Sequence, residues 1–331
     1  AKLKLVRRKK MVPPVRNDRR PGRRRCSSHC CTRALVLCAV LSGRPSPPPT
    51  RVSSTASPRG RRSSLVAEAL SSIKPSPARP LRLEPLGPAK PKTYSNPLGA
   101  TLSPIRDDVW LAERPFYPRL PGLTGVDVAC KAAIVKLRDG TLWVHAPVDL
   151  DAETKAAVDL LGPVRHVVSP NAEHVSFARQ WIEAYPEATA YAAPGLAERF
   201  PEIGWTEVCP PVPGAWLDEF ECAWIDAEKP PLGLLGNRPF FSEVVFCHKP
   251  SRTLFVTDLW WNYPADGPRL WKFGMDQVYR PFYNGLMRQR PRHDALIQQI
   301  LQWDFDYLVP CHGEPIAGPT VKQTLRDFFE L

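Results

Sequence analysis

The sequence predicts an α/β protein, a four-layer αβ/βα sandwich preceded by a disordered basic tail. Two β-hairpin patterns stand out, around the turns at residues 139–140 and 249–252, and alternating helix and strand patterns follow each of them. Two β-rich halves that each lead into α/β units favour two sheets packed face to face with helices outside. In addition, three apolar runs end abruptly on polar residues, as strand ends that form a site do.

Residues 1–95 are predicted to be a targeting or disordered segment. The first 92 residues carry 23 Lys and Arg against 3 Asp and Glu, and the segment is rich in Arg, Ser and Pro. It contains too little apolar surface to bury a core, so we expect disorder. This composition is typical of organelle transit peptides, with the plastid (chloroplast) as our first choice and the mitochondrion as our second. A basic arm that binds nucleic acid is the alternative.

An apolar run at residues 34–41 follows the basic start of this tail. It is too short to span a bilayer, which takes about 20 helical residues. It fits the core of a secretory signal, the first half of a bipartite plastid address, so we expect no membrane span in the mature protein. From residue 93 onward the chain holds 22 basic and 30 acidic residues, and this acidic balance gives a nucleic-acid partner no support.

The nine cysteines do not form a framework. None belongs to a Cys-x-x-Cys pair, which argues against structural zinc and against a disulfide scaffold. We expect reduced, partly buried thiols. Four lie in the tail and five in the body, at positions 26, 30, 31 and 38 and at positions 130, 209, 222, 247 and 311.

The first half of the body reads as a hairpin followed by helix and strand in alternation. Asp139-Gly140 between two β-rich runs is a strong hairpin signal. Asp151 is a helix cap, and Gly162-Pro163 is a stop. The expected elements are strands 130–138 and 141–145, helix 152–161, strand 164–168, helix 174–185, strand 188–192 and a helical turn at 196–200.

The second half repeats the plan with its own hairpin. Alternating and continuous apolar runs predict strands, and apolar residues at helical spacing predict helices. The expected elements are strands 216–225, 243–248 and 253–258, helix 292–303, strand 307–309 and helix 321–329.

Three of these strands lead directly into groups that can bind a metal. The strand at 164–168 runs into Ser169-Pro170-Asn171-Ala172-Glu173-His174, the strand at 253–258 ends on Asp258, and the last strand leads into Cys311-His312-Gly313. Because strand ends of α/β proteins converge at a cleft, we expect one shared site.

The order of elements and these three ends resemble the metallo-β-lactamase-like hydrolase superfamily, over about residues 129–331. Within it, the sequence resembles an uncharacterised branch, a domain of unknown function, found in photosynthetic organisms and bacteria. The superfamily's His-x-His-x-Asp-His run is represented by Ser169, Asn171, Glu173 and His174. Asp258 matches its bridging Asp. Residues 310–313, Pro-Cys-His-Gly, resemble its Pro-x-His-Gly motif.

Three of the family's histidines are missing: those at positions 169 and 171, and one expected near Pro239. The resemblance implies that Glu173, His174, Asp258 and His312 hold one divalent ion, Zn²⁺, Fe²⁺ or Mn²⁺. Asp258 and Glu173 are also the predicted catalytic carboxylates. The domain at residues 96–331 is then a mono-metal hydrolase of an ester, thioester or phosphoester of an unknown small molecule. The alternative is an inactive pseudo-enzyme, a binding or assembly factor in the organelle.

Each site residue also has an ordinary structural interpretation. His174 fits a histidine that bonds a backbone carbonyl, Glu173 a first-turn acid, and Asp258 a turn acid. We interpret Asn171 as a turn former rather than a ligand. Cys311 is interpreted as buried packing, with a thiolate ligand or a redox thiol as alternatives, and residues 260–261, Trp-Trp, as packing rather than a substrate platform.

Overall fold

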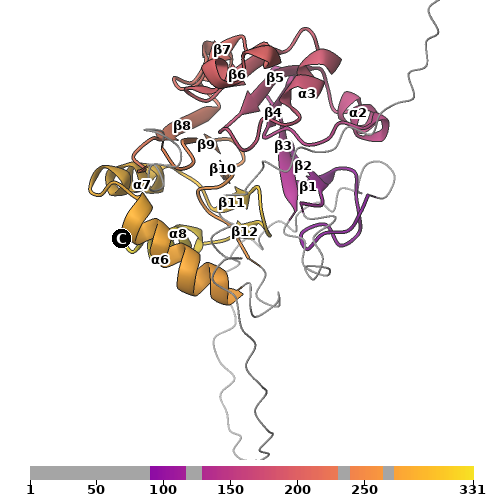
Figure 1. The fold of residues 1–331 in the computed structure, drawn as a ribbon. Helices are drawn as coiled ribbons and strands as arrows, with labels where there is room; N and C mark the ends of the chain where they lie inside the picture. The colour runs from indigo at the N-terminus through magenta and orange to yellow at the C-terminus, as the bar shows by residue number, and fades with distance from the viewer. Residues whose placement is uncertain (1–89, 117–128, 230–238, 264–271) are drawn as a thin grey trace, which may run out of the picture.

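The protein's structure is a computed structural model that describes residues 90–116, 129–229, 239–263 and 272–331 (Figure 1). Residues 1–89 lie outside the described ranges. The predicted disorder of the tail, its targeting role and the apolar run at 34–41 therefore stay predictions. At the start of the described chain, Nζ of Lys90 lies 2.7 Å from Oδ2 of Asp151, which joins this segment to the start of the first long helix.

The first sheet contains seven strands in sequential order. β1 to β4 run antiparallel, and β4 to β7 run parallel. The predicted hairpin around Asp139-Gly140 is confirmed as β3 and β4. The strands are β1 (Ser103–Arg106), β2 (Val109–Arg114), β3 (Cys130–Lys136), β4 (Leu142–His145), β5 (Val164–Ser169), β6 (Thr189–Ala192) and β7 (Glu207–Val208).

The second sheet contains five strands in the order β12-β11-β10-β9-β8. β10 and β11 are parallel, and the other neighbours are antiparallel. The second predicted hairpin is confirmed as β9 and β10. The strands are β8 (Phe220–Ile225), β9 (Glu243–His248), β10 (Thr253–Val256), β11 (Tyr307–Pro310) and β12 (Ile316–Ala317).

The longer helices agree with the sequence pattern. Asp151 caps the first of them, because its Oδ1 accepts the backbone N–H of Thr154 at 2.9 Å. The helices are α2 (Ala152–Asp159), α3 (Ala178–Ala184), α4 (Leu196–Arg199), α6 (Arg280–Phe282), α7 (Arg292–Gln302) and α8 (Val321–Phe329). There are also two 3₁₀ turns, η1 (Pro201–Ile203) and η2 (Gly214–Trp216), and two π-helical segments, η3 (Gly274–Tyr279) and η4 (Tyr283–Met287).

Four layers follow from which side chains are buried together. Trp143 of the first sheet packs against Phe246 and Phe255 of the second, so the sheets lie face to face. Trp181 of α3 and Val158 of α2 are buried with the outer face of the first sheet. The predicted αβ/βα sandwich is therefore confirmed.

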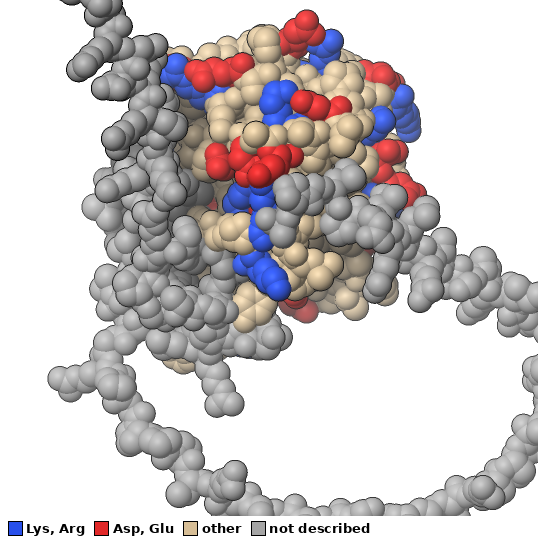
Figure 2. Space-filling view, turned by 90° about the vertical axis from the view of Figure 1, so that its right-hand side faces the viewer, with Lys and Arg blue, Asp and Glu red and all other residues tan. Residues whose placement is uncertain are grey.

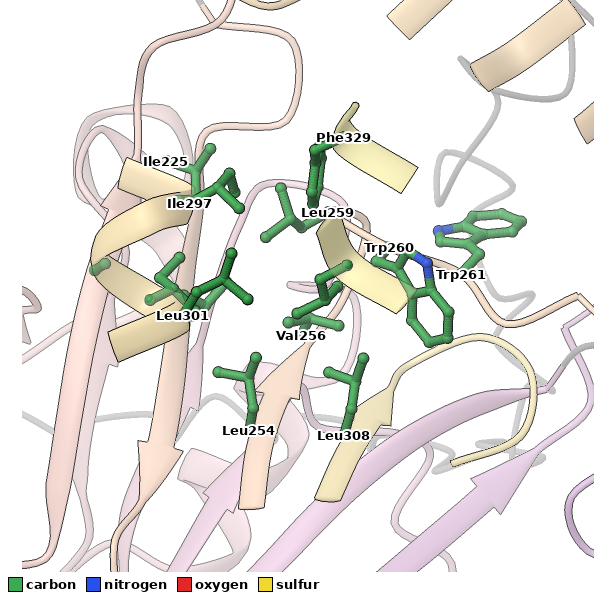
Figure 3. Close-up of a cluster of buried hydrophobic side chains, with 14 of the residues drawn as sticks. Ile225, Leu254, Val256, Leu259, Trp260, Trp261, Ile297, Leu301, Leu308 and Phe329 are labelled. Carbon is green, nitrogen blue, oxygen red and sulfur yellow. The ribbon is translucent and has the colours of Figure 1, made fainter. Parts of the chain in front are cut away.

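The fourth layer covers the outer face of the second sheet. Figure 3 shows Leu254 and Val256 of β10 and Leu308 of β11 pointing toward Ile297 of α7 and Phe329 of α8. These side chains are almost fully buried. This cluster fixes β10 and β11, whose ends lead into two of the three predicted site segments.

Several local predictions differ from the structure. The strand predicted at 216–225 begins only at Phe220, because Gly214–Trp216 form a 3₁₀ turn before it. The helix predicted from residue 174 begins only at Ala178, because Asn171 Oδ1 accepts the N–H groups of Glu173 and His174 and holds a turn there. β1 and β2 precede residue 130, where the first strand predicted from the sequence begins. The helical segment 274–287 was missed, since its wide π-type turns do not give the spacing of an α-helix.

The surface carries both signs of charge. On the face that Figure 2 shows, Lys and Arg side chains of the described residues are interspersed with Asp and Glu. Within the described ranges, no helix combines the length and the apolar character needed to cross a bilayer.

Candidate metal centre

The site forms where strand ends of both sheets meet at one edge. β4 and β5 are parallel, and β3 runs antiparallel to β4, so the start of β3 lies beside the ends of β4 and β5. The second sheet contributes the ends of β10 and β11, which are parallel. The two sheets are joined here, because Val244 N–H donates to the carbonyl of Pro170 at 2.9 Å.

His174, Asp258 and His312 converge at this edge. One ligand atom from each lies within 4.8 Å of the other two. Asp258 lies between the imidazoles, with Oδ2 3.3 Å from Nε2 of His174 and Oδ1 3.8 Å from Nε2 of His312. Two nitrogen or oxygen ligands on one tetrahedral Zn²⁺ lie about 3.3 to 3.4 Å apart. All three residues are buried, so the group matches the dimensions of a small cation site.

The tautomer of His312 leaves its Nε2 as a lone-pair donor. Nδ1 of His312 lies 2.7 Å from the carbonyl oxygen of Ala129, which can only accept, so Nδ1 carries the proton. Burial lowers the pKa of His312 to about 3, and the ring is therefore neutral. A bare Nε2 then faces the Asp258 carboxylate. This is how a second hydrogen bond orients a metal-binding imidazole.

His174 also directs an unsatisfied nitrogen at the same point. Its Nε2 has no hydrogen-bond partner in the part of the chain that the structure describes, although Asp258 lies 3.3 Å away. Burial opposes the imidazolium, but the contacts of the ring with Cys311 and with the Asp258 carboxylate outweigh it and raise the pKa of His174 well above 6.5. The carboxylate and the two nitrogens need a positive charge among them, and either a proton or a metal ion supplies it. The residues therefore fit a divalent cation.

Two buried side chains fix the position of Asp258. Asn171 donates from Nδ2 to Asp258 Oδ2 at 2.8 Å. Glu243 accepts the backbone N–H groups of Thr257, Asp258 and Leu259 at 2.6 to 2.8 Å. Burial, reinforced by the charge of Asp258, raises the pKa of Glu243 to about 7. The sequence interpretation of Asn171 as a turn former is confirmed, and its contact with Asp258 is an addition.

The His312 loop is held by a close backbone approach. Gly313 has φ +86°, and a Cβ there would lie 1.7 Å from the carbonyl oxygen of Asn262. Lys131 holds the same loop from β3, because its Nζ donates to the carbonyl oxygens of Cys311, at 3.4 Å, and Gly313. The loop therefore tolerates little displacement.

Aromatic rings cover the same imidazole. Trp261 and Phe116 place their ring centroids 4.3 Å and 4.5 Å from the centroid of His312. Trp260 and Trp261 are both buried, so the interpretation of this pair as packing is confirmed. These rings shield one side of the site from water.

A second group of ligand atoms lies on the other side of the His174 ring. Nδ1 of His174 is 3.6 Å from Sγ of Cys311 and 3.9 Å from Sγ of Cys130. The two sulfurs are 3.5 Å apart, and neither cysteine forms a disulfide with another described residue. Burial raises the pKa of Cys311 well above its usual value. Cys311 is buried as expected, while Cys130 is only partly covered.

The remaining predicted positions contribute differently. Glu173 is buried but belongs to neither group of ligand atoms, and its role as a ligand or a catalytic carboxylate stays a prediction. Ser169 has a buried Oγ without a hydrogen-bond partner among the described residues. Where the third missing histidine was expected, Phe240 and Phe241 pack into the core beside Tyr283.

Sequence reasoning did not find Cys130, Lys131 or Glu243. Cys130 and Cys311 are separated by 181 positions, and no local spacing links them. Glu243 looked like the first residue of a strand. An acid at the start of an otherwise apolar strand is a usable signal, because a buried carboxylate needs several donors.

A cavity of about 300 Å³ lies away from this centre. Arg106, Lys136, Arg138 and Arg252 contribute to its lining, together with His248 at the end of β9. None of the metal-centre residues lines it. Acidic residues line it as well, and nothing in its lining resembles the centre at the strand ends.

A family profile matches residues 106–282, and its description is "Domain of unknown function (DUF4336)". The chain belongs to this family. The DUF4336 match covers β2 to β10, together with His174 and Asp258. His312 lies beyond the matched residues. The expected occurrence in photosynthetic organisms stays a prediction. A comparison with curated proteins found no match.

Among solved structures, the DUF4336 chain is similar to metallo-β-lactamase-fold proteins at low identity. The DIM-1 metallo-β-lactamase is 14% identical over 70% of this chain and 95% of that one, with a TM-score of 0.46. The Flv1 flavodiiron core from Synechocystis sp. PCC6803 is 11% identical over 69% of this chain and 60% of that one, with a TM-score of 0.48. A putative diflavin flavoprotein A 5 fragment from Nostoc sp. PCC 7120 is 12% identical over 69% of this chain and 94% of that one, with a TM-score of 0.48.

Proposed function

We propose that this DUF4336 protein is a mono-metal hydrolase whose ion is bound by His174, Asp258 and His312. The observation that carries the proposal is the convergence of two imidazole nitrogens on one buried carboxylate. Such a group is costly to bury without a cation, because its lone pairs face one another in a low-dielectric interior. Nitrogen and oxygen ligands suit Zn²⁺, Fe²⁺ or Mn²⁺.

A divalent ion held there acidifies water and polarises the oxygen of an ester, thioester or phosphoester. Hydrogen bonds within the chain orient the side chains that would bind this ion. The carbonyl of Ala129 holds His312 in the tautomer whose Nε2 has a lone pair for the ion. Asn171 and Glu243 orient Asp258. Glu173 remains a candidate for a further ligand or a catalytic base, since it lies immediately before His174.

One observation favours a second candidate, a metal-free binding or assembly factor. Asn171 stands where the resemblance implies an imidazole, and its amide donates to Asp258 Oδ2, one of the atoms that would bind the ion. A proton shared between His174 and Asp258 would then complete the network without a metal. We propose the plastid as the place of action for either function, on the basis of the tail's composition. A fluorescent fusion of residues 1–95 tests this.

Mn²⁺ binding to the whole 331-residue chain separates the two candidates. Loss of the free-ion electron paramagnetic resonance spectrum measures binding, and Mn²⁺ prefers oxygen and nitrogen over sulfur. We expect about one ion per chain, lost in Asp258→Asn and His312→Gln. His248→Gln is the matched control, because His248 is a buried histidine at the far end of β9 from Glu243. No binding by the folded wild-type protein would support the metal-free factor.

Substrate class is tested on the same preparations. We expect the Mn²⁺-loaded protein to hydrolyse at least one of p-nitrophenyl acetate, a model acyl thioester and bis-p-nitrophenyl phosphate. Activity that is equal in Asp258→Asn and the wild type would exclude this centre as its source.

A further inference from the structure

We propose that Cys130, His174 and Cys311 form a second, sulfur-rich cation site that takes a thiophilic ion of the Zn²⁺, Cd²⁺ or Cu⁺ type. The site uses the opposite nitrogen of His174 from the one that faces Asp258. The three groups come from the start of β3, the turn after β5 and the end of β11.

The three distances match those between ligands of one ion. A tetrahedral Zn²⁺ with Zn–S near 2.3 Å and Zn–N near 2.0 Å separates two sulfurs by about 3.8 Å and sulfur from nitrogen by about 3.5 Å. The sulfurs of Cys130 and Cys311 are 3.5 Å apart, and they lie 3.9 Å and 3.6 Å from Nδ1 of His174. A small rearrangement therefore brings all three onto one ion.

Neighbouring groups support sulfur ligands at this position. The backbone N–H of Lys131 donates to Sγ of Cys311 at 3.3 Å, a contact that stabilises a thiolate. In the thiol form, Cys311 instead donates to the carbonyl of Lys131, 3.4 Å away. Cys130 is only partly covered, which gives a soft ion a route to an otherwise buried group. Soft thiolates select d¹⁰ ions over Mg²⁺ or Mn²⁺.

Binding at this site competes with the His174–Asp258–His312 centre; this consequence rests on the proposed function, whereas the sulfur site itself does not. A neutral imidazole has one bare nitrogen. When Nδ1 of His174 binds the soft ion, the ring's proton resides on Nε2, 3.3 Å from Asp258 Oδ2. That proton occupies the direction in which Nε2 would bind the other ion. Loading of the sulfur site therefore weakens the oxygen-rich site.

Cd²⁺ is the probe for the sulfur site, because thiolate ligands give it an ultraviolet charge-transfer band that carboxylates and imidazoles do not. The background is the 331-residue chain in which the four tail cysteines, at positions 26, 30, 31 and 38, are changed to serine. We expect about one equivalent of Cd²⁺ with this band. Cys130→Ser should weaken binding by more than the roughly 10- to 100-fold lost when a supporting hydrogen bond is removed.

Three further arms separate the possible outcomes. Cys222→Ser, a control at another partly buried thiol, should leave the band unchanged. Asp258→Asn should retain the band, which shows that the sulfur site stands even where the hydrolytic centre fails. In the wild type, Cd²⁺ should release Mn²⁺. A band that persists in folded Cys130→Ser and Cys311→Ser, or no band in the folded background, would overturn the proposal.

Discussion

Substitution of Gly313 by alanine tests how strictly the His312 loop is positioned. The added Cβ would lie 1.7 Å from the carbonyl oxygen of Asn262, whereas Cβ contacts under 3.0 Å essentially do not occur. The two backbone segments must therefore separate by more than an ångström. His312 precedes Gly313, and its carbonyl accepts the N–H of Asn262 at 3.2 Å, so the imidazole moves with the loop.

The cost has three parts. A left-handed conformation costs an L-residue about 1 to 2 kcal/mol. Loss of the Asn262–His312 hydrogen bond adds about 1 kcal/mol, and weaker donation from Lys131 adds a similar amount. We therefore expect the free energy of unfolding to fall by roughly 3 kcal/mol or more. Metal ligation tolerates displacements of about 0.2 Å, so Mn²⁺ binding should be lost.

Gly140→Ala is the matched control. Gly140 has φ +84°, nearly the same as Gly313, but its Cβ would meet nothing within 4 Å. This variant should lose only about 1 to 2 kcal/mol and should bind Mn²⁺ normally. Urea denaturation and Mn²⁺ titration measure both quantities. Equal losses in the two variants, with Mn²⁺ binding retained in both, would refute the close-approach argument.

Three other changes have defined outcomes. Phe329→Ala should lower the free energy of unfolding, measured in urea, by about 3 to 5 kcal/mol because the ring is fully buried. Leu160 is 79% exposed, so the control Leu160→Ala should change this free energy by no more than about 0.5 kcal/mol. Similar losses in the two variants would contradict the assigned core. Lys131→Met removes a donor to two loop carbonyls and should weaken Mn²⁺ binding in the same titration; unchanged affinity would contradict that positioning role. Burial lowers the pKa of His145 and His293 to about 3. Below pH 6.5 the unfolded chain therefore binds protons that the folded chain does not, and the free energy of unfolding falls as the pH drops toward 3. At pH 5 this loss is about 2 kcal/mol for each histidine. Urea unfolding of His293→Gln should accordingly lose less stability between pH 7 and pH 5 than the wild type does, and an equal loss would contradict the buried neutral ring.

Local patterns were sufficient for most of the fold. The Asp139-Gly140 turn, the Asp151 cap and the apolar runs of β5, β9 and β10 each carry a short-range physical signal. The helix predicted from residue 174 begins only at Ala178, because the Asn171 side chain accepts the N–H groups of the residues where it was expected to begin. Segment 274–287 follows a wide helical turn that no α-helical spacing reveals.

The candidate site was predictable only where polar residues end apolar strands. His174, Asp258 and His312 were found in this way, and the structure brings them together. Glu173 has the same kind of local signal, yet its neighbours along the chain do not determine where its carboxylate lies. Cys130 begins a strand with no distinguishing pattern, and only the packing of the two sheets places it beside Cys311.

The most direct test of the metal centre is anomalous diffraction from crystals of the protein grown with Mn²⁺. We expect one peak within about 2.0 to 2.3 Å of three atoms, Nε2 of His174, Nε2 of His312 and a carboxylate oxygen of Asp258. A peak elsewhere, or well-ordered side chains at these positions with no ion at a saturating concentration, would contradict this expectation.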